Sequence, residues 1–243
     1  MQLNIASPVN SNFAIPYDNS RVNNRHMNNG QYEAYYTQGD ENPAIPPRSV
    51  TDSGIRPKNI WGDFFQVAEG NCVTVSAIKA AMVKFGSHPR GIFNQVTKTP
   101  AGYKILMKDN VSVSLTHEEL RQAGDKAGFL GRGTVLQHAI FLYAASAKRA
   151  QLENNDGRAV RSFDAAMQTL NDGEHPGEAL TRLGLKQHFR RGTVEALKNG
   201  AIGTLADARH SVAVVDGHMD LWGIRRRLAN SDWESAPVAL ILV

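Results

Sequence analysis

The order of helix-like and strand-like segments is the feature that most constrains the fold of this chain. From residue 116 to residue 198 the expected elements are helices, whereas from residue 202 onward they are all strands. With an earlier helix at 72–85, the expected helices cover residues 116–123, 133–152, 159–170, 177–183 and 194–198, and the expected C-terminal strands cover residues 202–205, 211–215, 219–224 and 238–243. Because helices and strands are grouped and not alternated, we predict an α+β fold in two lobes.

The helix expected at residues 72–85 has a clear local signal. Its apolar residues recur at helical spacing on one face, at Val75, Ile78, Met82 and Phe85. Gly86 follows directly, with Pro89 shortly after, and these two residues end the helical pattern. The sequence therefore predicts both ends of this helix.

A hairpin and a capped helix are expected next. Residues 103–108 and 111–115 alternate apolar and polar side chains on either side of a short turn, which is typical of a β-hairpin. Thr116 then has Glu119 three residues further on, the spacing of a capping box at the start of a helix. These signals place a hairpin inside the helix-rich part of the chain.

Residues 1–58 differ in composition from the remainder. They are rich in Asn, Ser, Pro, Gly and Tyr and have neither helical nor strand periodicity. Such a segment buries too little apolar surface to offset the entropy of ordering, so we expect a disordered or loosely attached leader ahead of one domain at residues 59–243. Three interpretations stay open: a plain tail, a non-cleaved leader for a specialised secretion system, and a propeptide or substrate-like arm.

Composition limits the expected location and partners. The chain has 243 residues and one Cys, so no intrachain disulfide can form, which favours a reducing compartment. No apolar run reaches the length of about 18 residues that suggests a membrane span, and residues 1–12 have no Sec-type signal pattern. The net charge of +4 is spread along the chain and is densest at residues 225–227, without interleaved aromatic residues. We therefore expect no nucleic-acid partner, with salt-dependent duplex binding by residues 225–227 as a minor alternative.

Cys72 is the candidate nucleophile. A thiol attacks a carbonyl as the thiolate, and a helix N-terminus or a neighbouring imidazolium lowers the thiol pKa. Cys72 stands at the expected start of a helix, where unpaired N–H groups and the helix dipole stabilise an anion. Gly70 gives the preceding turn the freedom to place the sulfur there. Considered without other residues, such a Cys is more often simply part of a core.

Three further residues join Cys72 in a catalytic pattern. Gln66 lies six residues before Cys72, where its amide can help the Cys72 backbone N–H to hold an oxyanion. His210 heads an apolar strand and is the candidate general base. Asp220 follows ten residues later, and a carboxylate there could orient the imidazole.

In this order and spacing the chain resembles the papain-like cysteine peptidases, including the calpain-like branch. In that family a Gln precedes the catalytic Cys by six residues, the Cys opens a long central helix, and the His begins a strand of a β lobe. Trp222-Gly223 is similar to the end of the family's Asn-x-Trp-Gly motif, and the 138 residues between Cys72 and His210 are of the usual size. The resemblance implies a helical lobe with the Cys packed on an antiparallel β lobe with the His.

The chain also departs from the family pattern. Val73 stands where papain has an aromatic residue after the nucleophile, and the interval from His210 to Asp220 is short. A tight turn between the two strands would put Asp220 opposite Ala213, with its carboxylate facing away from the imidazole. Two other carboxylates, Asp216 and Asp232, therefore stay open as alternatives for the third catalytic residue.

The expected activity is cysteine-dependent amide hydrolysis through a thioester, with proteolysis of a protein substrate as the first expectation. Two alternatives stay open: glutamine deamidation or transglutamination on the same fold, and an inactive papain-like binding protein. The Asn-rich leader and the missing Sec signal suggest a virulence effector secreted into a host cell, and otherwise a cytoplasmic protein. No cofactor is expected, and no metal is expected because no pair of closely spaced His or Cys ligands is present. The oligomeric state is not predicted.

Overall fold

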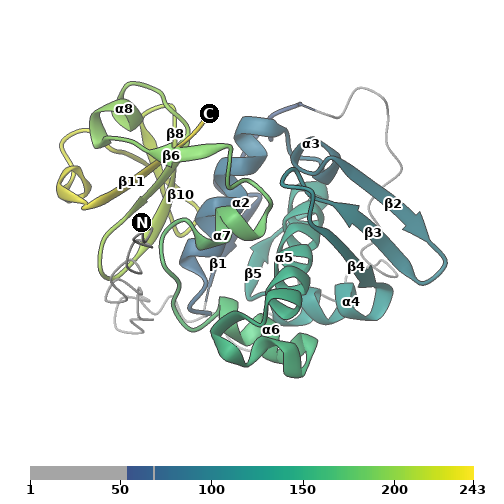
Figure 1. Cartoon of the computed structure of the whole chain (residues 1–243). Coiled ribbons are helices and arrows are strands. Elements are labelled where there is room, and N and C mark those ends of the chain that lie inside the picture. The colour runs from purple at the N-terminus through teal and green to yellow at the C-terminus, as the bar shows by residue number, and fades with distance from the viewer. Residues whose placement is uncertain (1–53, 68) are drawn as a thin grey trace, which may run out of the picture.

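The computed structural model describes residues 54–67 and 69–243. Over these residues the chain has an α+β fold with a helical lobe and a β lobe, and the long helix α2 lies between them (Figure 1). The predicted α+β class is confirmed. The leader predicted at residues 1–58 lies outside the described residues, apart from its last five, and the boundary at residue 59 stays a prediction.

Helix α2 (Cys72–Phe85) begins and ends where the sequence predicts. Twelve of its fourteen residues are buried, because it packs against the β lobe on one side and the helical lobe on the other. The chain leaves the helix at Gly86, whose φ of 99° lies in the region that favours glycine. A helix buried on all sides is typical of the centre of a domain.

The helical lobe contains five helices and two small antiparallel sheets among the described residues. The helices besides α2 are α3 (Pro89–Ile92), α4 (His117–Lys126), α5 (Gly133–Glu153), α6 (Phe163–Leu170) and α7 (Glu178–Arg182), with 3₁₀ turns η2 (Asn155–Gly157) and η3 (Ala159–Arg161). One sheet has the order β2 (Gln95–Thr99), β3 (Gly102–Leu106), β4 (Ser112–Thr116), and the other pairs β1 (Phe64–Gln66) with β5 (Phe129–Gly131).

Most sequence expectations for this lobe are confirmed. The predicted hairpin is β3–β4, and Thr116 and Glu119 form the predicted capping box at the start of α4. The helix predicted at residues 159–170 is wrong in its first part. Ser162 is extended and caps α6 through a hydrogen bond from the N–H of Ala165, so η3 and α6 are separate elements.

The β lobe is a six-stranded antiparallel sheet. Its order is β10-β9-β8-β7-β11-β6, with β6 (Phe189–Arg191), β7 (Gly203–Ala206), β8 (Ser211–Val215), β9 (His218–Leu221), β10 (Ile224–Arg227) and β11 (Val238–Leu242), accompanied by α8 (Val194–Lys198) and η4 (Asp232–Ser235). The single strand predicted at residues 219–224 is wrong, because Trp222 and Gly223 have φ values of 50° and 81° and form a turn between β9 and β10.

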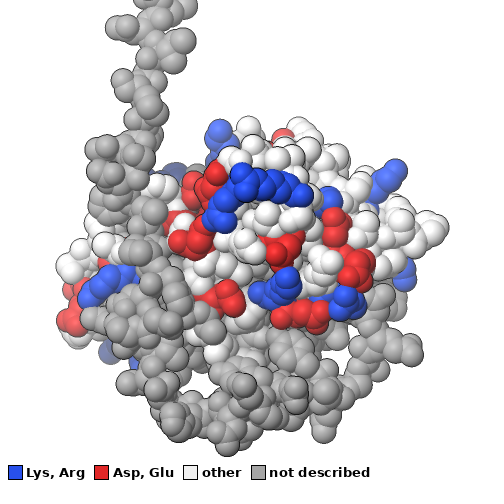
Figure 2. Space-filling model, turned by 90° about the horizontal axis from the view of Figure 1, so that it is seen from below, with Lys and Arg blue, Asp and Glu red and all other residues white. Residues whose placement is uncertain are grey.

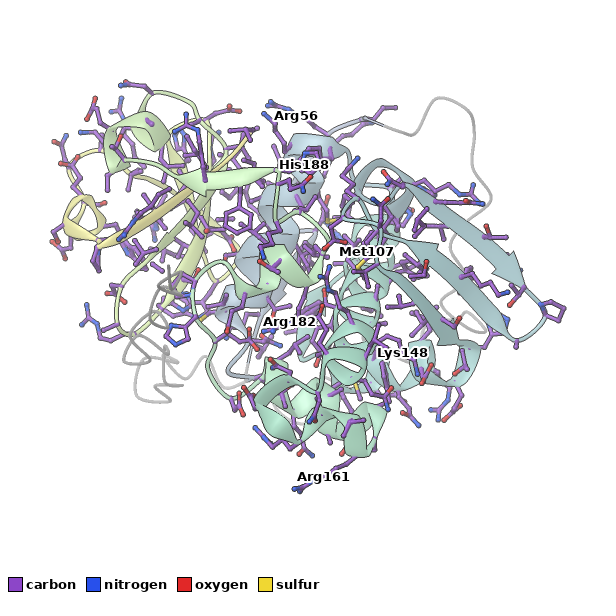
Figure 3. The ribbon with its side chains drawn as sticks, viewed as in Figure 1. Arg56, Met107, Lys148, Arg161, Arg182 and His188 are labelled. Carbon is purple, nitrogen blue, oxygen red and sulfur yellow. The ribbon has the colours of Figure 1, made fainter. Side chains whose placement is uncertain are left out.

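Strand β8 connects the two parts of the core. All five of its residues are buried, because α2 covers one face of the sheet and a second apolar cluster covers the other. Val215 belongs to the main core, whereas Val212 and Val214 pack with Leu197 of α8 in the second cluster. At the far end of α2, the His188 ring lies edge-on to Phe85, with the ring centroids 5.9 Å apart (Figure 3). Strand β8 therefore lies against α2, between the main core and the second apolar cluster.

Candidate functional site

Cys72 is the first residue of α2 and lies against the start of β8. Its side chain is buried, which raises the pKa of the thiol, and the backbone N–H of Ser211 acts in the opposite direction. One turn further along the helix, the hydroxyl groups of Ser76 and Ser211 are 2.8 Å apart and share a hydrogen bond. The first turn of α2 is thus fixed to the residue that directly follows His210.

His210 is placed by a tight turn that ends at β8. The carboxylate of Asp207 accepts the backbone N–H groups of Arg209, at 2.7 Å, and of His210, at 2.8 Å. This is the local pattern by which an Asp side chain stabilises a turn. The imidazole stacks on the indole of Trp222, with ring centroids 4.8 Å apart and planes 13° apart, and Trp233 approaches edge-on at 6.2 Å.

Gln66 ends strand β1 close to the same place. Its side chain is buried, and its Nε2 donates a hydrogen bond to the carbonyl oxygen of Glu69 at 2.5 Å. An amide has two N–H hydrogens, so the other hydrogen remains for a second acceptor. The predicted oxyanion residue therefore has a fixed side chain with a donor to spare.

Three of the four predicted site residues line one small cavity between α2 and β8. Gln66, His210 and Asp220 contribute to its wall, together with Ser76 and Trp222. The cavity has room for about one water molecule. Cys72 does not line it and lies one helical turn before Ser76. The structure thus gathers Gln66, His210 and Asp220 around one cavity, with Cys72 one helical turn from its wall.

The expected hydrogen bond between Asp220 and His210 is not formed. Asp220 instead pairs with Lys79 of α2, at 2.9 Å between Oδ2 and Nζ, and its Oδ1 accepts the N–H of Gly223 at 3.2 Å. The register of the hairpin explains this, because Val214 pairs with Met219 and the next positions along are Ala213 and Asp220. The carboxylate therefore faces α2. The sequence predicts that a tight turn puts Asp220 opposite Ala213 and turns its side chain from the imidazole, but it does not predict the pairing with α2.

Neither of the two alternative carboxylates forms a hydrogen bond with the imidazole. Asp216 is at the other end of β8, in the turn to β9, where it pairs with Arg56 at 3.5 Å on the surface. Asp232 begins η4 and is exposed. Asp207, which the sequence analysis missed, is the carboxylate whose charge acts on His210. Its position three residues before a candidate base was a usable signal.

Lys79 is the other residue that sequence reasoning missed. Its side chain has no exposed surface, which is rare for a lysine. Nζ donates to the carbonyl oxygen of Trp61 at 2.9 Å and lies 5.0 Å from the centroid of the Phe64 ring. A lysine inside the apolar run from Cys72 to Phe85 was the available signal, because a buried ammonium needs an acidic partner.

Burial controls the protonation of Cys72 and His210. It raises the pKa of the Cys72 thiol to about 11, although the N–H groups of Ser211, Val73 and Cys72 itself act in the opposite direction. Burial also lowers the pKa of His210 to about 4, against the attraction of Asp207. At neutral pH both groups are therefore neutral, a thiol and an imidazole and not a thiolate and an imidazolium.

Burial acts on the Lys79–Asp220 pair as well. It lowers the pKa of Lys79 and raises the pKa of Asp220, and in each case the charge of the partner opposes the shift. Removing either charge from the pair would leave the other uncompensated in a buried place.

Neither a metal centre nor a membrane span is found in the part of the chain that the structure describes. Within residues 54–67 and 69–243, no three His, Cys, Asp or Glu side chains are grouped to hold a metal ion. No helix in these ranges is long and apolar enough to cross a bilayer. On the face seen in Figure 2, Lys and Arg side chains are interspersed with Asp and Glu side chains.

No protein-family model, no curated protein and no solved structure matches this chain.

Proposed function

We propose that this chain is a cysteine-dependent amide hydrolase of papain-like arrangement, with Cys72 as nucleophile and His210 as general base. The observation that carries the proposal is the packing of α2 on β8: the hydroxyl groups of Ser76 and Ser211 share a hydrogen bond at 2.8 Å, which holds the helix that begins at Cys72 against the strand that His210 precedes. Two details add support. Gln66 lines the same small cavity as His210 and Ser211 and has a second amide hydrogen to donate, and Trp222 covers the imidazole as the Trp of the papain motif would.

The neutral resting pair determines how the first step would run. His210 takes the proton from the Cys72 thiol as the sulfur attacks an amide carbonyl, so that charge develops only when substrate is bound. The backbone N–H of Cys72 and the amide of Gln66 hold the oxyanion. The imidazolium then gives its proton to the leaving amine, and water hydrolyses the thioester.

Proteolysis of a protein substrate is the first choice among the reactions that this chemistry serves, because it is the commonest use of the scaffold. Glutamine deamidation has the same first half, with ammonia as the leaving group, and transglutamination replaces water by an amine. The proposed setting is a bacterial effector that acts on host proteins. Ammonia release from a glutamine-containing protein, against new N-termini, separates deamidation from proteolysis.

The rate of alkylation of Cys72 by iodoacetamide against pH tests the proposal without knowledge of the substrate. Cys72 is the one thiol of the chain, so the reaction has a single site. A base-assisted thiol should react at a nearly constant rate between about pH 5 and pH 9, above the pKa of His210 and below that of Cys72. In His210→Ala this plateau should disappear, and the rate should rise only toward the pKa of the thiol.

The matched control for this experiment is His218→Ala, in the same hairpin but at the other end of β8. It should keep the plateau. A folded wild-type chain that reacts only above about pH 9, with or without His210, would contradict the proposal.

A second candidate, a papain-like binding protein without catalysis, is favoured by one observation. The carboxylate expected to orient the imidazole is paired with Lys79, and the thiol is buried. This candidate predicts that His210→Ala leaves the alkylation profile unchanged, so the same experiment decides between the two.

A further inference from the structure

Lys79 joins three segments of the chain at one buried point. It lies two helical turns after Cys72 on α2, so the two residues share a face of the helix. Its ammonium contacts the carbonyl oxygen of Trp61, the carboxylate of Asp220 on β9 and the face of the Phe64 ring. The charge of Asp63 also acts on Lys79, and the charge of Asp207 acts on His210. Lys79 therefore holds β9 against the helix that bears the nucleophile.

Asp220 connects Lys79 to the turn that follows β9. Oδ1 accepts the N–H of Gly223, which closes the turn through Leu221 and Trp222, while Oδ2 is held by Lys79. The turn is strained, because Trp222 has a φ of 50°, in the left-handed region that a bulky residue rarely adopts. Such a conformation persists only where surrounding contacts hold it.

The strained turn determines the position of the Trp222 indole. This side chain is 40% exposed, yet one face of its ring lies parallel to the imidazole of His210. Among the described residues, the His210 ring makes no hydrogen bond, so its contacts with Trp222 and Trp233 are what orient it.

We infer that Lys79 and Asp220 are positioning residues for His210, and that they act through the Asp220–Gly223 turn and the indole of Trp222. Asp220 thus influences the imidazole from its place beside Lys79, without the direct hydrogen bond of a catalytic triad. The effect on reactivity rests on the proposed function, whereas the effect on the orientation of the ring does not.

The position of the indole can be read from the NMR signals of the His210 ring protons in the full chain. A stacked indole shifts these signals upfield. Trp222→Ala, which removes a partly exposed side chain, should abolish the shift and provide the reference value. Lys79→Met should move the same signals toward that value and should lower the alkylation plateau of Cys72.

Arg182→Met is the matched control for the loss of a buried cation. Arg182 lies on α7 in the helical lobe and pairs with the buried carboxylate of Glu174 (Figure 3). It does not line the cavity that His210 lines. The Arg182→Met substitution should destabilise the protein and leave the His210 signals unshifted from those of the wild type. If Lys79→Met does not fold, Lys79→Met/Asp220→Leu removes both buried charges together and should show the same loss of the upfield shift.

The possible results separate the two proposals. His210 signals in a folded Lys79 variant that coincide with those of the wild type would overturn the positioning role. A shift that is lost in Lys79→Met and Trp222→Ala, with alkylation unchanged in both and in His210→Ala, would support the positioning role and overturn the proposed hydrolase.

Discussion

Acidification from pH 7 to pH 5 is expected to destabilise this protein through His210. Burial lowers the pKa of this imidazole from 6.5 to about 4, so the folded state favours the neutral ring. The contribution of His210 to the free energy of unfolding is fully present above 6.5, the pKa of the imidazole in the unfolded chain. It is lost as the pH falls from 6.5 toward 4. The whole shift corresponds to about 3 kcal/mol, of which about 2 kcal/mol is lost by pH 5.

Replacing His210 by Gln isolates this contribution. The variant cannot be protonated in this range, so the pH dependence that His210 causes should vanish while that of all other groups remains. Urea unfolding of the wild type and of His210→Gln at pH 7 and pH 5 measures the difference. At a typical urea dependence, about 2 kcal/mol moves the midpoint by about 1 M.

His218→Gln serves as the control, since it removes another histidine of the same hairpin that lies far from the Trp222 stack. It should follow the wild type at both pH values. Equal losses of stability in the wild type and in His210→Gln would refute the reasoning, because they would mean that the folded state does not hold the imidazole neutral.

Two substitutions test the packing that positions the site. Met82→Ala, at a fully buried position of α2, should lower the free energy of unfolding by about 2–5 kcal/mol, measured with urea. The control is Leu152→Ala at a position that is 63% exposed, which should change this free energy by about 0.5 kcal/mol or less. Similar losses in both variants would argue against the central place of α2. Gly203→Ala should lower the thermal midpoint sharply, because a Cβ there would lie 1.9 Å from the carbonyl oxygen of Leu240 on the paired strand. Gly124→Ala in helix α4, where a Cβ would make only an ordinary contact with Cγ2 of Ile140 at 3.9 Å, should raise the thermal midpoint through a gain of about 0.5–1 kcal/mol. A rise for both variants would contradict the close approach of β7 and β11.

Local signals in the sequence were sufficient for most elements. Helix α2 begins at Cys72 and ends before Gly86 because the apolar spacing and the glycine each act over a few residues. The capping box at Thr116 and the hairpin β3–β4 follow for the same reason. The turn at Trp222 was missed, because a tryptophan at positive φ goes against the local preference of that residue.

The sequence by itself determined the α+β class, the placement of Cys72 at a helix start and of His210 before a strand, and the order of the candidate residues. Only the tertiary structure decided the partner of Asp220. That choice depends on the register of β8 and β9, which turns the carboxylate toward α2, and on Lys79, which lies far away in the sequence. Local periodicity carries no information about such a pairing. It arises because two charges that are buried by separate segments are stable only when they meet.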